Sequence, residues 1–222
     1  MKRIVIGGVI VFAVGLFAPR IATAQGTTTY LSNLGQASAG SLAVGSDSWL
    51  AAEFITGTNA GGYSLNSIQL AMTDASGIPS GFTVMLYTSQ AHTSLPGNRL
   101  DTLDGSLNPV SSGIYTYNPT NNITLSGYYL IVVTAGTSVT NGAYDWSLAG
   151  TNSYNASGNW FAGTVTGGED IFTSQNGSSW NFSEANPQFA INATAVPEPG
   201  VLGLLGLGGL CFLWHHRKAK AD

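Results

Sequence analysis

The stretch 128-YYLIVVT-134 decides the fold class of this chain. It is continuously apolar, and its centre, Ile131 to Val133, consists of β-branched residues. Such a run packs well on a pleated sheet and has no polar face to turn towards solvent. We therefore expect Tyr128–Thr134 to be a central β-strand that is buried on both faces.

The segments around this run are short apolar stretches separated by Gly, Ser, Asn and Pro. One of them, Ser67–Met72, alternates, with Ile68, Leu70 and Met72 on one face. No window carries a sustained helical stripe of apolar residues. Regular short strands between such turns are typical of an antiparallel β-sandwich, so we predict an all-β, jelly-roll-like domain. The other predicted strands are Trp49–Ile55, Phe82–Tyr87, Ile114–Tyr117, Tyr144–Leu148 and Gln188–Ala193.

The segment Gly150–Asn186 is the least regular part of this domain. It is rich in Gly, Asn and Ser, yet it carries several aromatic residues, which disordered linkers seldom contain. We expect long loops and short strands that fold over one edge or end of the sandwich.

The charge of the domain excludes whole classes of partner. Between Gln25 and Val196 the single basic residue, Arg99, stands against nine acidic residues, a formal net charge of −8 with histidine neutral. Binding to nucleic acid requires clustered Lys and Arg, and binding to anionic lipid headgroups requires the same. We therefore expect no nucleic-acid partner. The single cysteine, Cys211, lies outside the domain, which consequently has no disulfide or thiolate site.

Catalytic signatures are sparse. The only histidine of the domain, His92, lies in a polar, turn-rich stretch typical of a surface loop. No G-x-S-x-G, H-E-x-x-H or P-loop motif occurs. We predict that the protein is not an enzyme. The alternative is a secreted carbohydrate-active enzyme that uses paired carboxylates, drawn from Asp101, Asp104, Asp145, Glu169 and Asp170.

Two binding sites can be considered. The carboxylates of Asp101 and Asp104, and those of Glu169 and Asp170, lie in loop-like settings that suit structural calcium, although no known calcium-binding spacing is present. No other cofactor is expected. Trp160 beside Asn159 could stack on a sugar ring and bind its hydroxyls, whereas Trp146 alternates with Tyr144 and Leu148 and is expected in the core.

The amino terminus predicts export. Lys2 and Arg3 precede an apolar run and a small-x-small site ending at Ala24. This pattern is typical of a secretory signal peptide, residues 1–24, which signal peptidase removes. The β-sandwich is then expected to span residues 25–193.

The carboxyl terminus has three parts in order. A linker, residues 194–200, contains Pro197, Glu198 and Pro199, and an apolar run, Val201–Trp214, is followed by a basic tail, residues 215–222. The run of 14 residues is about 21 Å long as a helix, shorter than the bilayer core of about 30 Å. The aromatic residue and the positive charges after it favour a transmembrane helix with the domain outside and the tail in the cytoplasm.

This tripartite end resembles the PEP-CTERM sorting signal of Gram-negative bacteria. The resemblance covers Val196–Asp222, with His215 and His216 where a denser arginine cluster is usual. It implies that a membrane-embedded exosortase removes the tail near Pro197, Glu198 and Pro199. Carriers of this signal usually occur beside exopolysaccharide genes, which makes exopolysaccharide a candidate partner.

The domain also resembles the choice-of-anchor R extracellular domains. The stretches that carry this resemblance are SIQLAMTDASGIPSGFTVMLYTSQAHTSLPGNRLDTLDG, GYYLIVVTAG and YDWSLAG, within Ser48–Ala190. It implies an exported β-sandwich without an assigned activity. Together these features predict a non-enzymatic protein of the cell surface or exopolysaccharide matrix, transiently anchored in the inner membrane, with a structural, adhesive or glycan-binding role.

Overall fold

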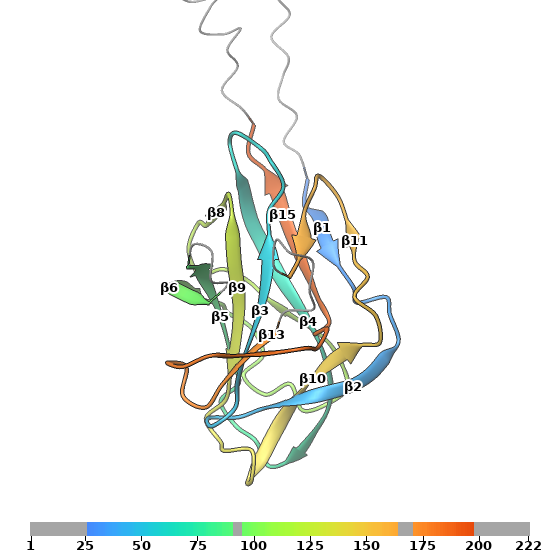
Figure 1. Cartoon of the computed structure of the whole chain (residues 1–222), viewed down its shortest axis with the longest axis vertical. Helices are drawn as coiled ribbons and strands as arrows, with labels where there is room; N and C mark the ends of the chain where they lie inside the picture. Colours follow the sequence, from blue (N-terminus) through green and yellow to red (C-terminus); the bar gives the residue numbers. More distant parts are fainter. Residues whose placement is uncertain (1–25, 91–94, 164–170, 198–222) are drawn as a thin grey trace, which may run out of the picture.

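Two antiparallel β-sheets make up the described part of the chain (Figure 1). The computed structural model describes residues 26–90, 95–163 and 171–197, and no helix occurs among them. The same residues therefore contain no helix long and apolar enough to cross a bilayer. The predicted signal peptide, the predicted transmembrane helix and His92 all lie outside them.

The first sheet has the strand order β11-β1-β15-β4-β10-β2, and the long strand β4 also pairs with β7 and β8. Its strands are β1 (Thr28–Ser32), β2 (Ser38–Val44), β4 (Tyr63–Gly77), β7 (Gly113–Tyr117), β8 (Thr124–Leu125), β10 (Gly142–Ala149), β11 (Asn155–Ala156) and β15 (Phe189–Ala195).

The second sheet has the order β14-β13-β3-β9-β5-β6, with β12 also paired to β3. Its strands are β3 (Trp49–Ile55), β5 (Thr83–Ser89), β6 (Pro96–Thr102), β9 (Tyr128–Thr134), β12 (Phe161–Ala162), β13 (Ile171–Ser174) and β14 (Asn181–Ser183).

Strand β9 has the position that its sequence predicts. It lies between β3 and β5 in the second sheet. Ile131 and Val133 pack into the main core that the two sheets share, whereas Leu130 and Val132 pack into a smaller cluster with Phe172. Successive side chains of a strand point to opposite faces, so a continuously apolar strand needs both clusters.

Strand β4 supplies the opposite wall of the main core. Ile68, Leu70 and Met72 are buried there, which confirms the predicted alternation. The strand is longer than predicted because neighbouring strands continue the pairing beyond Ser67–Met72 at both ends.

The end of the domain differs from the predicted boundary. Thr194 and Ala195, which the sequence placed in a linker, belong to β15 and pair with Ser64 and Tyr63 of β4. Their composition resembles a linker, but backbone pairing with β4 decides their structure.

The first sheet changes its strand order partway along β4. Strand β10 pairs with the end of β4 as far as Trp146 and then turns from it towards the start of β15, where Gln188 N donates to Ser147 O at 2.8 Å. From Phe189 onwards, β15 replaces β10 as the strand that pairs with β4 on this side. The segments that join β1 to β2 and β10 to β11 both pass this junction, and they form the pocket described below.

Candidate functional site

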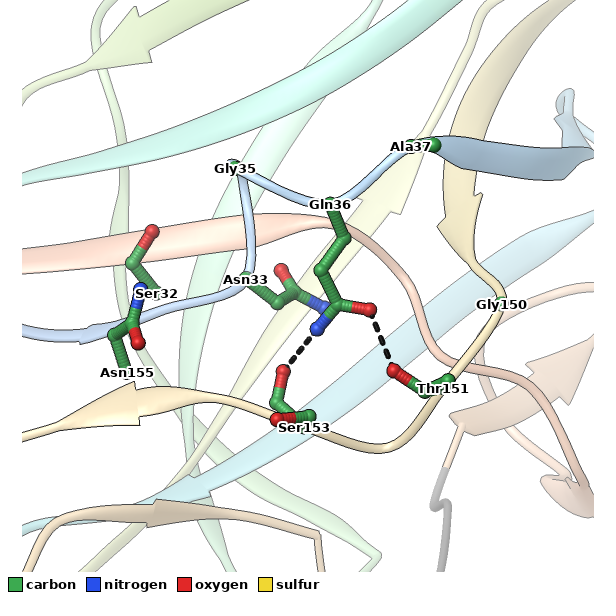
Figure 2. A pocket seen from close by; sticks show the side chains of 9 residues that line it. All are labelled: Ser32, Asn33, Gly35, Gln36, Ala37, Gly150, Thr151, Ser153 and Asn155. Carbon is green, nitrogen blue, oxygen red and sulfur yellow. Dashed lines mark hydrogen bonds between the residues drawn. The ribbon is translucent and has the colours of Figure 1, made fainter.

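A pocket of about 500 Å³ lies between the β1–β2 segment and the β10–β11 segment (Figure 2). Side chains of Asn, Gln, Ser and Thr alternate there with small residues, and no charged or aromatic side chain lines it. The lining residues are Ser32, Asn33, Gly35, Gln36, Ala37, Gly150, Thr151, Ser153 and Asn155.

Gln36 bridges the two segments across the pocket (Figure 2). Its Nε2 donates to the backbone oxygen of Ser153, and its Oε1 accepts a hydrogen bond from Thr151 Oγ1 at 2.8 Å. The two segments are far apart in the sequence, so this side chain holds the opposite sides of the pocket together.

Asn33 and Gln188 support the pocket from beneath. Asn33 Nδ2 donates to Pro187 O at 3.0 Å, and Asn33 Oδ1 accepts from Phe189 N at 2.8 Å. Gln188 Nε2 donates to Gln36 O at 2.8 Å, and its Oε1 accepts from Ser147 Oγ at 2.6 Å. Because strands exchange partners here, these buried amides satisfy backbone groups that a regular ladder would pair.

The lining chemistry suits a neutral polar ligand. Ser153 and Asn155 are exposed, and hydroxyl and amide groups can both donate and accept hydrogen bonds. The lining contains no His, Cys or carboxylate that could act as nucleophile, base or metal ligand. The lining thus consists of groups that can form hydrogen bonds with hydroxyls, and it offers no His, Cys or carboxylate for acid–base catalysis.

The structure places Trp160 in the core, not on the surface. It is 2% exposed, and its ring stacks on Tyr30 and contacts Tyr63 edge-on, with centroid distances of 5.1 and 5.0 Å. Asn159, at φ 63°, is exposed in the turn that directs Trp160 inward. No face of this indole is open to a sugar, so the suggested glycan contact at Trp160 does not fit the structure.

Trp146 lies in the core as predicted. It is fully buried, and its Nε1 donates to Gln188 O at 3.0 Å. This bond connects the core to the place beneath the pocket where β15 replaces β10 beside β4.

The carboxylate of Asp101 has a structural role. It is 7% exposed and accepts hydrogen bonds from Thr120 N at 2.7 Å, from Thr120 Oγ1 at 2.5 Å and from Asn121. Burial acts to raise the pKa of Asp101, but the hydrogen bonds from Thr120 and Asn121 outweigh it and lower the pKa below its ordinary value. The carboxylate thus fastens the segment after β7 to strand β6.

Among the described residues, the other predicted carboxylates are those of Asp104 and Asp145, and Asp104 forms a backbone bridge with Asn118 just after β6. Asp145 belongs to β10 in the first sheet, where burial raises its pKa and a hydrogen bond from Ser41 acts against the rise. Glu169 and Asp170 lie outside the described residues. Within the described ranges, no group of three or more His, Cys, Asp or Glu residues is placed to hold a metal ion.

The predicted sorting signal begins where the last strand ends. Ala195 pairs with Tyr63, and Val196 N donates to Gly62 O at 3.0 Å. Pro197 follows directly, while Glu198 and Pro199 lie outside the described residues. Strands β1 and β15 pair with each other, and both termini of the domain lie at one end of it, at the top of Figure 1.

Sequence reasoning missed the pocket residues. Asn33, Gln36 and Asn155 are polar residues in a chain full of similar ones, and no local pattern distinguishes them. The only signal is their three-dimensional proximity.

Comparison with known proteins identifies the carboxyl-terminal signal. Residues 195–218 match the PEP-CTERM protein-sorting motif, which is associated with exosortase processing and implies a protein sorted to the cell surface. No curated protein and no solved structure matches the chain. The resemblance to choice-of-anchor R domains stays a prediction.

Proposed function

We propose that the chain is a non-enzymatic protein of the cell surface or exopolysaccharide matrix, delivered there through its carboxyl-terminal signal. Signal peptidase removes residues 1–24, and residues 201–214 hold the chain in the inner membrane with residues 215–222 in the cytoplasm. An exosortase then cuts near Pro197, Glu198 and Pro199, and the β-domain remains outside.

One observation carries this proposal: the match at residues 195–218 begins on the last residue of the last strand. The motif therefore overlaps the domain only at the end of its last strand, and the remaining matched residues follow that strand. The acidic surface, with Arg99 as the single basic residue between Gln25 and Val196, supports a solvated extracellular component.

Intact mass and location of the full chain, expressed in an exosortase-containing host, test the sorting role. In the triple variant Pro197→Ala, Glu198→Ala, Pro199→Ala, we expect a mass that retains the tail and loss of the surface form. Glu184→Ala, which removes an exposed carboxylate of the domain, is the control and should be processed normally. The proposal fails if the triple variant has the same mature mass and location as the wild type.

A second function, binding of a neutral glycan, is supported by the uncharged hydroxyl and amide lining of the pocket. The probe is a panel of neutral oligosaccharides applied to the mature protein, with acidic oligosaccharides as the comparison. Asn155→Ala should weaken binding about tenfold by removing a ligand hydrogen bond. Asn152→Ala, in the same segment but not in the lining, should leave it unchanged. Equal binding by both variants would exclude this pocket as the glycan-binding site.

A further inference from the structure

A turn at residues 59–62 holds the chain at the start of the sorting motif. Gly62 N donates to Asn59 O at 2.9 Å, which closes the turn, and Gly62 has a φ of 71°. Val196 N donates to Gly62 O, and Asn59 Nδ2 donates to Val196 O at 3.1 Å. Both backbone polar groups of Val196 are therefore bonded to this turn.

The turn also lies in close contact with Val196. A Cβ atom added at Gly61 would be 2.5 Å from Val196 O. Only glycine allows the two segments to approach this closely. The position of Val196 thus depends on a side chain, Asn59, and on the absence of one at Gly61.

The sorting motif overlaps this fastened region. The match starts at Ala195, which pairs with Tyr63 in β4, and Val196 is the next residue. Upstream of them, β15 is paired on both sides, by β1 and by β4. Peptidases cut exposed chain whose backbone is free, so β15 and Val196 are withheld from them while the turn is closed.

We propose that the turn at residues 59–62 sets the upstream limit of carboxyl-terminal processing. It holds Val196 against the domain, so cleavage by the processing enzyme and later trimming fall downstream of Val196. In each cleavage a peptide C–N bond is hydrolysed: water gives its hydroxyl to the carbonyl carbon, which becomes the new terminal carboxylate, and a proton to the amine of the departing tail. Asn59 is then a positioning residue for processing and does not touch the reacting bond. This inference rests on the proposed sorting through Pro197, Glu198 and Pro199.

The test uses the full chain in an exosortase-containing host, with the mature protein recovered from the surface. Its carboxyl terminus is read by intact mass, and hydrogen exchange is measured at the Val196 amide. The wild type should end downstream of Val196. In Asn59→Ala, exchange at Val196 should be about fivefold faster and a new population should end upstream of Val196. Gly61→Val, which displaces Val196 directly, should give more of that population.

Asn66→Ala is the matched control. Asn66 lies at the same end of the domain and bonds Thr27 and Thr194, not Val196. The Asn66→Ala protein should keep the wild-type carboxyl terminus. If its terminus shifts upstream as much as that of Asn59→Ala, the cause is a general loosening of this end of the domain, and the proposal is overturned. A single wild-type terminus in both Asn59→Ala and Gly61→Val would also overturn it. The two proposals fail separately, because the triple variant at Pro197, Glu198 and Pro199 tests sorting without altering the turn.

Discussion

At the scale of single residues, Asp101 shows how a carboxylate that resembles a ligand or catalyst becomes part of the scaffold. Its oxygens are occupied by Thr120 and Asn121, so neither is free to coordinate calcium or to protonate a glycosidic oxygen. The sequence could not reveal this, because Thr120 reaches Asp101 only through the fold.

Asp101→Asn should destabilise the domain by about 1 to 3 kcal/mol near neutral pH, because an amide replaces an acceptor of several hydrogen bonds. The pKa of an unfolded aspartate is about 3.9. Since the folded pKa is lower, the stabilisation is fully present above that value and is lost as the pH falls through the folded pKa. Urea unfolding should therefore show a difference in the free energy of unfolding between wild type and variant, and this difference should disappear in acid.

The control for this experiment is Asp104→Asn. Asp104 is close in sequence, and its hydrogen bonds with Asn118 are made by backbone atoms. A gap of similar size and pH dependence in Asp104→Asn would contradict the assignment to Asp101.

Trp160 is the second residue whose role the structure decides. Trp160→Ala should destabilise the domain by about 3 to 5 kcal/mol, because a large buried ring is removed. Trp160→Phe should cost less, since the indole Nε1 has no hydrogen-bond partner among the described residues and no bond is lost. Thermal unfolding of the two variants checks this order, and equal stability of wild type and Trp160→Ala would contradict the core assignment.

At the scale of elements, the strands that could be predicted are those that carry an apolar face into the core. β3 and β9 have the bounds that the sequence predicts, and β7 and β10 differ from it by only one or two residues at their ends. β1, β2 and β6 were missed because they contain mainly polar or exposed residues and exist through pairing with a neighbour. The short strands expected within Gly150–Asn186 are present as β11, β12, β13 and β14, and their exact positions follow from pairing with β1, β3 and β13.

Contact between two connections also shapes this domain. A Cβ atom at Gly57, after β3, would lie 1.5 Å from the backbone oxygen of Gly158 and 3.1 Å from Trp160 Cδ1. Gly57→Ala should therefore destabilise by at least about 3 kcal/mol, because backbone has to move. Gly35→Ala, with open space around its Cβ, should change stability by less than about 0.5 kcal/mol. Denaturant midpoints of the two variants test the difference, and a small effect at Gly57 would show that the two connections separate freely.

At the scale of the whole molecule, the arrangement of the ends determines how the domain is presented. β1 and β15 are adjacent, so the chain enters and leaves the domain at one end (Figure 1). The sorting motif is attached at that end without a spacer, because pairing continues to Ala195 and the turn at residues 59–62 holds Val196. The pocket lies where strands of the first sheet exchange partners. Its lining residues are distant in the sequence from the sorting motif.

The sequence by itself determined the all-β class, the central strand and the sorting signal. Each is written in consecutive residues: an apolar run, an alternation, and Pro197-Glu198-Pro199 followed by an apolar and a basic segment. Only the tertiary structure decided the burial of Trp160, the pocket at Gln36 and the fastening of Val196. Those features join residues more than a hundred positions apart, as Gln36 to Ser153 and Asn59 to Val196 show. Local composition cannot specify such contacts, because they form only when strand pairing brings distant segments together.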